Sequence, residues 1–184
     1  LKLLEEPPES VLFILLTSSG ESIFPTVVSR CQWIDLNPLP LDTIARELRE
    51  ALETPPQEAA KLARLSAGRI GWALEAARDP RLVEDYTVEL GRMASMLDGT
   101  LEKRFAYAEE VAALLVRDRE KALGRLNLAV SWWRDLLVLK SGNREFVANV
   151  PAMDALEGHA RWISTPQVME AITMTQDMMS LLDG

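Results

Sequence analysis

From Leu41 to the end of the chain, apolar residues recur at spacings of three and four positions. This spacing places them on one face of an α-helix, so the segment is predicted to form a succession of amphipathic helices. Prolines and glycines divide it into three short helices between residues 40 and 79 and longer helices from 80 to 184. The pattern therefore predicts a mainly α protein, with a three-helix module followed by a helical bundle.

The first 39 residues have a different pattern. Residues 1–6 have helical character and are followed by Pro7 and Pro8, which end a helix. The run 11–16 is apolar without alternation, which is typical of a strand covered on both faces in a parallel sheet. A second short strand is predicted at 32–36. Residues 1–39 are accordingly expected to be the end of an α/β domain, preceding regions 40–79 and 80–184.

Charge and cysteine content exclude several functional classes. The chain has 28 acidic and 20 basic residues, and a net charge of -8 opposes a large sequence-independent contact with a phosphate backbone. Cys31 is the single cysteine, so neither an internal disulfide nor a four-cysteine zinc site is possible, and no metal site is expected. The longest apolar run is too short to cross a bilayer, and no signal peptide is apparent. A cytoplasmic protein is expected.

A complete catalytic site is not predicted in these residues. A phosphate-binding Gly-x-x-x-x-Gly-Lys-Ser/Thr loop is absent from the 184 residues, so they are not expected to hold a nucleoside triphosphate alone. His159 is the single histidine and is predicted to be a structural or surface residue. The chain lacks an initiating methionine and begins in what resembles the middle of a helix, so we expect a fragment of a longer protein.

Three motifs follow one another near the start of the chain. They are Leu-Leu-Glu-Glu-Pro-Pro-Glu at 3–9, Phe-Ile-Leu-Leu-Thr-Ser-Ser at 13–19 and Pro-Thr-Val-Val-Ser-Arg-Cys at 25–31. In this order they resemble the AAA+ clamp-loader subunits of bacterial DNA polymerase III. The resemblance implies that residues 1–39 end an AAA+ α/β domain, that 40–79 form its three-helix lid, and that 80–184 form a helical collar for oligomerisation.

The resemblance assigns a catalytic role to Arg30. In this family the arginine of Ser-Arg-Cys reaches into the ATP site of the neighbouring subunit as an arginine finger. A guanidinium is planar and permanently charged, so it can contact two γ-phosphate oxygens at once. Without the family context, a local salt bridge is the simpler interpretation of Arg30. Cys31, which follows it, is predicted to be a small buried residue.

Thr17 and Ser18 fall where the resemblance places the sensor-1 region that contacts nucleotide. An equally simple interpretation is a turn after a strand, where serine and threonine are common. No cofactor is expected in the chain itself, because the resemblance implies that ATP is bound by neighbouring subunits.

The stretch 66–74 distinguishes between subunit types within the family. ATP-hydrolysing relatives carry a sensor-2 arginine in a Gly-x-x-Arg motif, and here Gly71 stands at that position. Arg69 is displaced by two residues, about 200 degrees around a helix, and is predicted to face solvent. This departure resembles a non-hydrolysing stator subunit. The alternatives are an ATPase motor subunit of the gamma or tau type, and a helical interaction module unrelated to nucleotide.

The segment 132–140 resembles the collar helix of the same family. At least one of the adjacent Trp132 and Trp133 is predicted to lie in the core, while Arg134 and Asp135 are predicted to be surface or ion-pair residues. Four methionines are predicted to fill gaps in the core: Met169, Met174, Met178 and Met179. The implied partners are gamma/tau and delta subunits in a pentameric ring, with the sliding clamp and primed DNA contacted through the assembly.

Overall fold

The computed structural model describes residues 10–17 and 23–183. The chain divides into two units, residues 38–179 and residues 1–37 with 180–184, and each is treated by itself. None of the helices in the described residues is long and apolar enough to cross a membrane.

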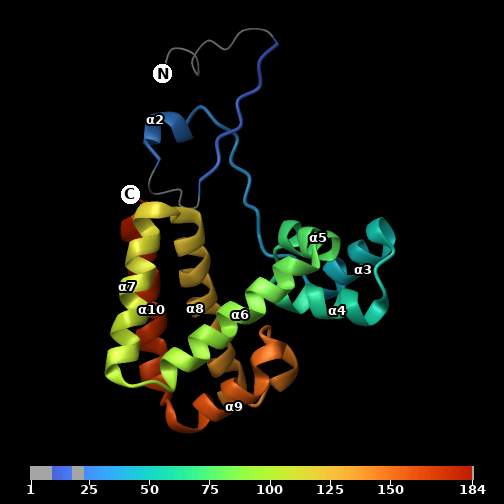
Figure 1. Ribbon diagram of the computed structural model, residues 1–184. Helices are drawn as coiled ribbons and strands as arrows, with labels where there is room; N and C mark the ends of the chain where they lie inside the picture. Colours follow the sequence, from blue (N-terminus) through green and yellow to red (C-terminus); the bar gives the residue numbers. More distant parts are fainter. Residues whose placement is uncertain (1–9, 18–22, 184) are drawn as a thin grey trace. The chain divides into compact units, whose positions relative to one another are not determined.

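Among the described residues before 38, the first unit has one short helix, α2 (Pro25–Val28), between irregular segments (Figure 1), and the unit also includes the last turn of α10 (Thr165–Asp183). The strands predicted at 11–16 and 32–36 are not formed, and the predicted helix at 1–6 lies outside the described residues. Leu12 and Leu16 are 83% and 86% exposed rather than covered. A strand is stabilised by hydrogen bonds to a neighbouring strand, and the described residues contain no such neighbour.

The second unit begins with the three predicted short helices, which are confirmed. They are α3 (Leu41–Leu52), α4 (Pro56–Leu65) and α5 (Ile70–Arg78). Their apolar faces meet around Ile44, Leu48, Leu62 and Ala73, all of which are buried. We call α3, α4 and α5 the short-helix module.

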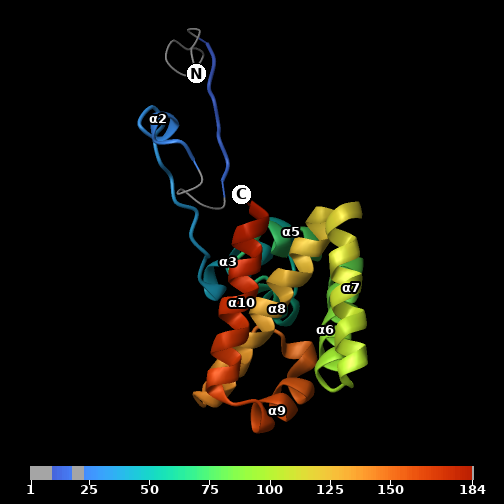
Figure 2. The ribbon, with the colours of Figure 1, turned by 90° about the vertical axis from the view of Figure 1, so that its left-hand side faces the viewer.

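Further helices, most of them longer, follow from Pro80. They are α6 (Pro80–Leu97), α7 (Leu101–Arg117), α8 (Arg119–Lys140), α9 (Met153–Trp162) and α10 (Thr165–Asp183), with 3-10 turns η2 (Arg144–Phe146) and η3 (Val150–Ala152) between α8 and α9. We call α6 to α10 the helical bundle, and Figure 2 shows α8 with α7 on one side and α10 on the other. Its core surrounds Trp132 and Leu136, and the predicted division into three domains at residues 39 and 79 stays a prediction.

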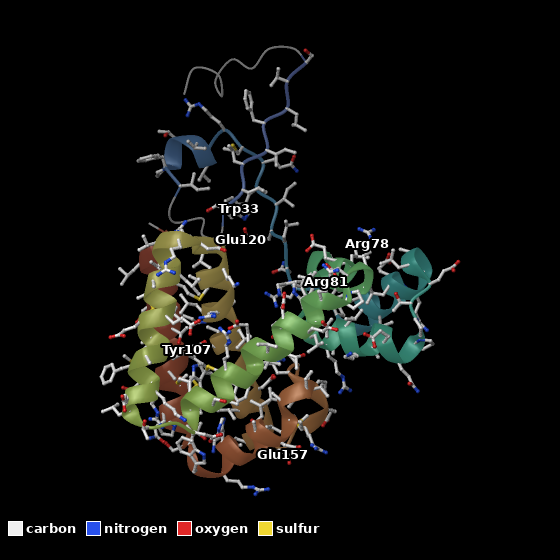
Figure 3. All side chains as sticks on the ribbon, viewed as in Figure 1. Trp33, Arg78, Arg81, Tyr107, Glu120 and Glu157 are labelled. Carbon is white, nitrogen blue, oxygen red and sulfur yellow. The ribbon has the colours of Figure 1, made fainter. Side chains whose placement is uncertain are left out.

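Local capping explains where two of these helices begin. The Asp79 carboxylate accepts a hydrogen bond from the Arg81 amide at the start of α6, where Arg78 and Arg81 mark the junction with α5 (Figure 3). The Asp118 carboxylate accepts one from the Lys121 amide at the start of α8. Capping therefore separates α7 from α8 although the chain between them is a single residue.

The turn between α4 and α5 requires glycine at position 68. Gly68 has a φ of +89°, and a side-chain carbon there would clash with the Pro38 Cβ and lie 3.0 Å from the Pro38 Cα. The Leu39 amide donates to the Gly68 carbonyl over 2.9 Å, so the two segments cannot easily separate. We expect Gly68→Ala to lower the free energy of unfolding by about 2 kcal/mol.

Urea unfolding followed by far-ultraviolet circular dichroism checks this prediction. Gly71→Ala is the matched control, because Gly71 lies within α5 and an added Cβ meets nothing within 4 Å. It should be neutral or stabilise the chain by up to about 1 kcal/mol. Equal unfolding midpoints for the two variants would contradict the assigned role of Gly68.

Candidate functional site

Arg30 lies immediately after α2, in a helical turn that begins at Pro25. Proline fits the first position of a helix because its fixed φ is already helical. The Arg30 amide donates to the Val27 carbonyl over 3.1 Å, and its guanidinium Nη1 donates to the Thr26 carbonyl over 2.7 Å. The residue is exposed, so the turn presents a guanidinium on the surface of its unit.

Two other residues predicted near the nucleotide are only partly described. Thr17 is exposed at the end of the 10–17 segment, and Ser18 lies outside the described residues, so the sensor-1 assignment stays a prediction. The prediction for Cys31 is wrong, because its thiol is exposed. Burial of a small residue needs chain packed over it, and every described residue from 28 to 37 is itself exposed.

The region compared with sensor 2 lies at the start of α5. Arg69 is the N-cap residue of α5, is exposed as predicted, and donates from Nε to the Ser66 carbonyl over 3.0 Å. Gly71 is the second residue of the helix and has open space beside it. The position that the resemblance compares with the sensor-2 arginine is therefore a glycine, which has no side chain.

A buried polar network crosses the bundle. The Asp135 side chain is fully buried on α8 and accepts hydrogen bonds from the Asn149 amide at 2.8 Å, the Asn149 Nδ2 at 2.9 Å and the Ala148 amide at 3.1 Å. Arg134 Nη1 lies 3.0 Å from Asp135 Oδ1, so the predicted ion pair is present. Four donors therefore hold one buried acid.

Burial governs the titration of this network. The pKa of the Asp135 carboxyl is raised because burial disfavours its charge, while the hydrogen bonds from Asn149 and Ala148 and the charge of Arg134 act in the opposite direction. Burial likewise raises the pKa of Tyr86, whose hydroxyl donates to Asn149 Oδ1 over 2.6 Å. Asp135 lies three positions after Trp132 and one before Leu136, on the core face of α8. This helical spacing is the feature of the sequence that indicates burial of Asp135.

A second cluster joins α6, α7 and α8 through Arg125. Its guanidinium is only 5% exposed; Nε lies 2.9 Å from Glu89 Oε2 and Nη2 lies 3.0 Å from Glu110 Oε1. Tyr107 projects from α7 (Figure 3), with its ring centre 5.9 Å from the same guanidinium. The hydrogen bond from Arg125 lowers the pKa of Glu110. The carboxylates are held by arginine, and no group of three or more acidic, histidine or cysteine side chains suited to a metal occurs in the described residues.

The structural prediction for His159 is confirmed. The ring is 2% exposed and lies between Trp132 and Trp162, with centroid distances of 5.5 and 5.8 Å. Its Nε2 lies 2.9 Å from Asp98 Oδ1, which joins α9 to the end of α6. Trp132 is fully buried and Trp133 is half-buried, as predicted for the adjacent pair.

Two bundle helices expose apolar side chains. On α7, Leu101, Phe105 and Val116 are 68%, 63% and 89% exposed, and the exposed Ala108 and Ala112 lie between them on the same face. On α10 the prediction of core methionines is wrong for three of the four: Met169, Met174 and Met178 are exposed, and Met179 is half-buried. The core stripe of α10 runs instead through Val168 and Ile172.

Comparison with known proteins finds that the chain is similar to subunits of DNA polymerase III. Residues 1–40 match the family described as DNA polymerase III, delta subunit. The chain is 30% identical over 167 residues to DNA polymerase III subunit tau of Escherichia coli K12, covering 86% of the chain and 26% of the relative.

Two further relatives carry related names. The chain is 29% identical to DNA polymerase III subunit gamma of Buchnera aphidicola, over 75% of the chain and 40% of the relative. It is 22% identical to DNA polymerase III subunit delta' of Bacillus subtilis, over 87% of the chain and 48% of the relative. The chain thus spans about half or less of the length of these relatives, and no solved structure matches it.

Proposed function

We propose that this chain, which belongs to the family of DNA polymerase III clamp-loader subunits, serves as the non-hydrolysing stator of the delta-prime type. In this role it donates Arg30 to the ATP site of a neighbouring subunit while the complex loads the sliding clamp onto primed DNA. The observation that carries the proposal is the exposed guanidinium of Arg30, presented by the turn after α2 within the region that matches the family.

The chemistry expected of Arg30 is electrostatic. Charge spreads over the γ-phosphoryl oxygens as the phosphoryl group leaves, and a planar guanidinium can donate to two of these oxygens. The neighbour supplies ATP, so this chain contributes one positive group to a site that it does not build. Thr17 and Ser18 are proposed as the sensor-1 region.

The stator assignment rests on the start of α5. With Gly71 in place of the sensor-2 arginine, and with Arg69 bonded to the Ser66 carbonyl, the short-helix module offers no cation for a nucleotide at that position. A stator needs no such cation, because it does not hydrolyse ATP at a site of its own.

An ATPase motor subunit of the gamma or tau type is the second candidate. Identities of 30% and 29% to tau and gamma relatives favour it over the 22% to delta'. Equilibrium binding of labelled ATP to the full-length protein separates the two, because a motor binds the nucleotide through its own phosphate loop and a degenerate stator does not.

The apolar face of α7 supports assembly with other subunits. Leu101, Phe105 and Val116 form a stripe that no described residue covers, and alanines at its centre allow another helix to approach closely. We propose that this face contacts gamma/tau or delta subunits in a pentameric ring in the cytoplasm. With a net charge of -8, attraction to DNA is expected to come from other members of the assembly.

Phe105→Glu is expected to weaken association with the other loader subunits at least about tenfold, because a carboxylate would be buried without a partner at the contact. Co-elution on a sizing column measures the effect. Phe146→Glu is the control, since Phe146 is similarly exposed, at 56%, but lies in η2. If both variants co-elute equally with the other subunits, α7 is not part of the contact. Failure of the unmodified chain to co-elute would favour a helical module unrelated to nucleotide.

A further inference from the structure

Helix α6 belongs to two hydrophobic cores. Near its start, Leu82 and Val83 pack against the buried residues of the short-helix module. Further along, Leu90, Met93 and Leu97 enter the core of the helical bundle. One continuous helix therefore contributes to both cores. The orientation of the short-helix module depends on the contacts that hold α6 where one core ends and the other begins.

Tyr86 lies at that point and contacts both sides. Its ring meets the ring of Trp72 on α5 edge to face, with centroids 5.5 Å apart and planes at 60°. Its hydroxyl donates to Asn149 Oδ1, over 2.6 Å, at the start of η3. A single side chain thus joins the short-helix module to the bundle.

Asn149, which accepts the hydrogen bond from Tyr86, is itself held in place by α8. Asn149 is fully buried, and its Nδ2 donates to Ser131 Oγ over 3.0 Å and to Asp135 Oδ2 over 2.9 Å. Its backbone amide also donates to Asp135. Because both amide protons are committed to α8, the Asn149 oxygen is held in one orientation for the Tyr86 hydroxyl.

On one side the module and the bundle leave a surface hollow between them, although α4 also approaches η3. A hollow of about 600 Å³ separates Arg64 on α4 from Arg144, Val150 and Met153 on the bundle side. Such a hollow provides little apolar packing to resist a tilt of the module. The tyrosine contact therefore adds a specific orientational restraint to the approach of α4 to η3.

We propose that Tyr86 is a latch that fixes the start of α6, and with it the short-helix module packed on α6, against η3 of the helical bundle, so that the module tilts away from η3 when the Tyr86–Asn149 hydrogen bond opens. This inference rests on contacts within residues 38–179 and is independent of the proposed function. The latch is conformational: no bond is made or broken other than the hydrogen bond.

Electron spin resonance distance measurement on the chain tests the latch. Nitroxide labels are attached to cysteines at the exposed positions Gln57 on α4 and Arg161 on α9, in a Cys31→Ser background. With Tyr86 present, one narrow distance distribution is expected. Tyr86→Phe keeps the ring and loses the hydrogen bond, so a second, displaced component should grow about fivefold.

The matched control is Tyr107→Phe, since the contact of Tyr107 with Arg125 is made by its ring. It should leave the distribution unchanged. Trp72→Leu removes the module side of the latch and should reproduce the effect of Tyr86→Phe, with folding verified by circular dichroism. A distribution that stays narrow in both folded variants, Tyr86→Phe and Trp72→Leu, would overturn the proposal.

Discussion

Replacing Arg30 with alanine is expected to lower ATP hydrolysis at the neighbouring site of the assembled clamp loader by about 10³-fold or more. The guanidinium sits at the surface after α2 and bonds through Nη1 to the Thr26 carbonyl. Because α2 is formed by backbone hydrogen bonds and Pro25, the substitution should leave the turn and the helical bundle intact. Clamp-stimulated phosphate release, measured with the full-length protein in the complex, reports the effect.

Two variants make the result specific. Arg30→Lys keeps the charge but loses the planar pair of donors, so it should recover only a small part of the rate. Arg161→Ala removes an exposed arginine from α9 and should leave the rate unchanged. If hydrolysis by a complex of normal composition is unaffected by Arg30→Ala, the finger assignment is wrong and the chain contributes by assembly alone.

Asp135→Ala is expected to lower the free energy of unfolding by about 4 kcal/mol. The substitution leaves the amides of Ala148 and Asn149 and one of the two Asn149 Nδ2 protons without an acceptor in the core, while Ser131 still accepts the other. It also leaves a cavity beside Trp132 and Leu136, which are fully buried. Urea unfolding of the chain, followed by tryptophan fluorescence and circular dichroism, gives the difference.

Asp85→Ala is the control for this substitution, because Asp85 is an exposed acid on α6 and its removal should change stability by less than about 0.5 kcal/mol. Asp135→Asn should also be costly, since its NH₂ group would face amide donors. A loss below about 1 kcal/mol for Asp135→Ala would show that water satisfies these donors and that the network contributes little.

The helices could be predicted because their signal is local. Apolar residues at spacings of three and four marked α3 to α10, and proline and glycine marked several of their ends. Each of these features acts within a few residues along the chain, so periodicity alone was sufficient. The buried position of Trp132 followed from the same pattern.

The strands and several burial assignments could not be predicted in this way. The run 11–16 has the composition of a buried strand, but a strand depends on a partner that composition cannot supply, and the run is exposed. Met174 and Met178 were predicted to be buried because they are apolar, yet they lie on the outer face of α10. Burial depends on which helix face meets a neighbour.

The amino-acid sequence by itself determined the order of the helices, their ends and the motif that presents Arg30, since these depend on residues within a few positions of one another. Only the tertiary structure decided that Tyr86 meets Asn149, 63 residues further along the chain, and that Asp135 holds both Ala148 and Asn149. Hydrogen bonds between such distant residues form only after hydrophobic packing brings their helices together, and helical periodicity carries no information about that pairing.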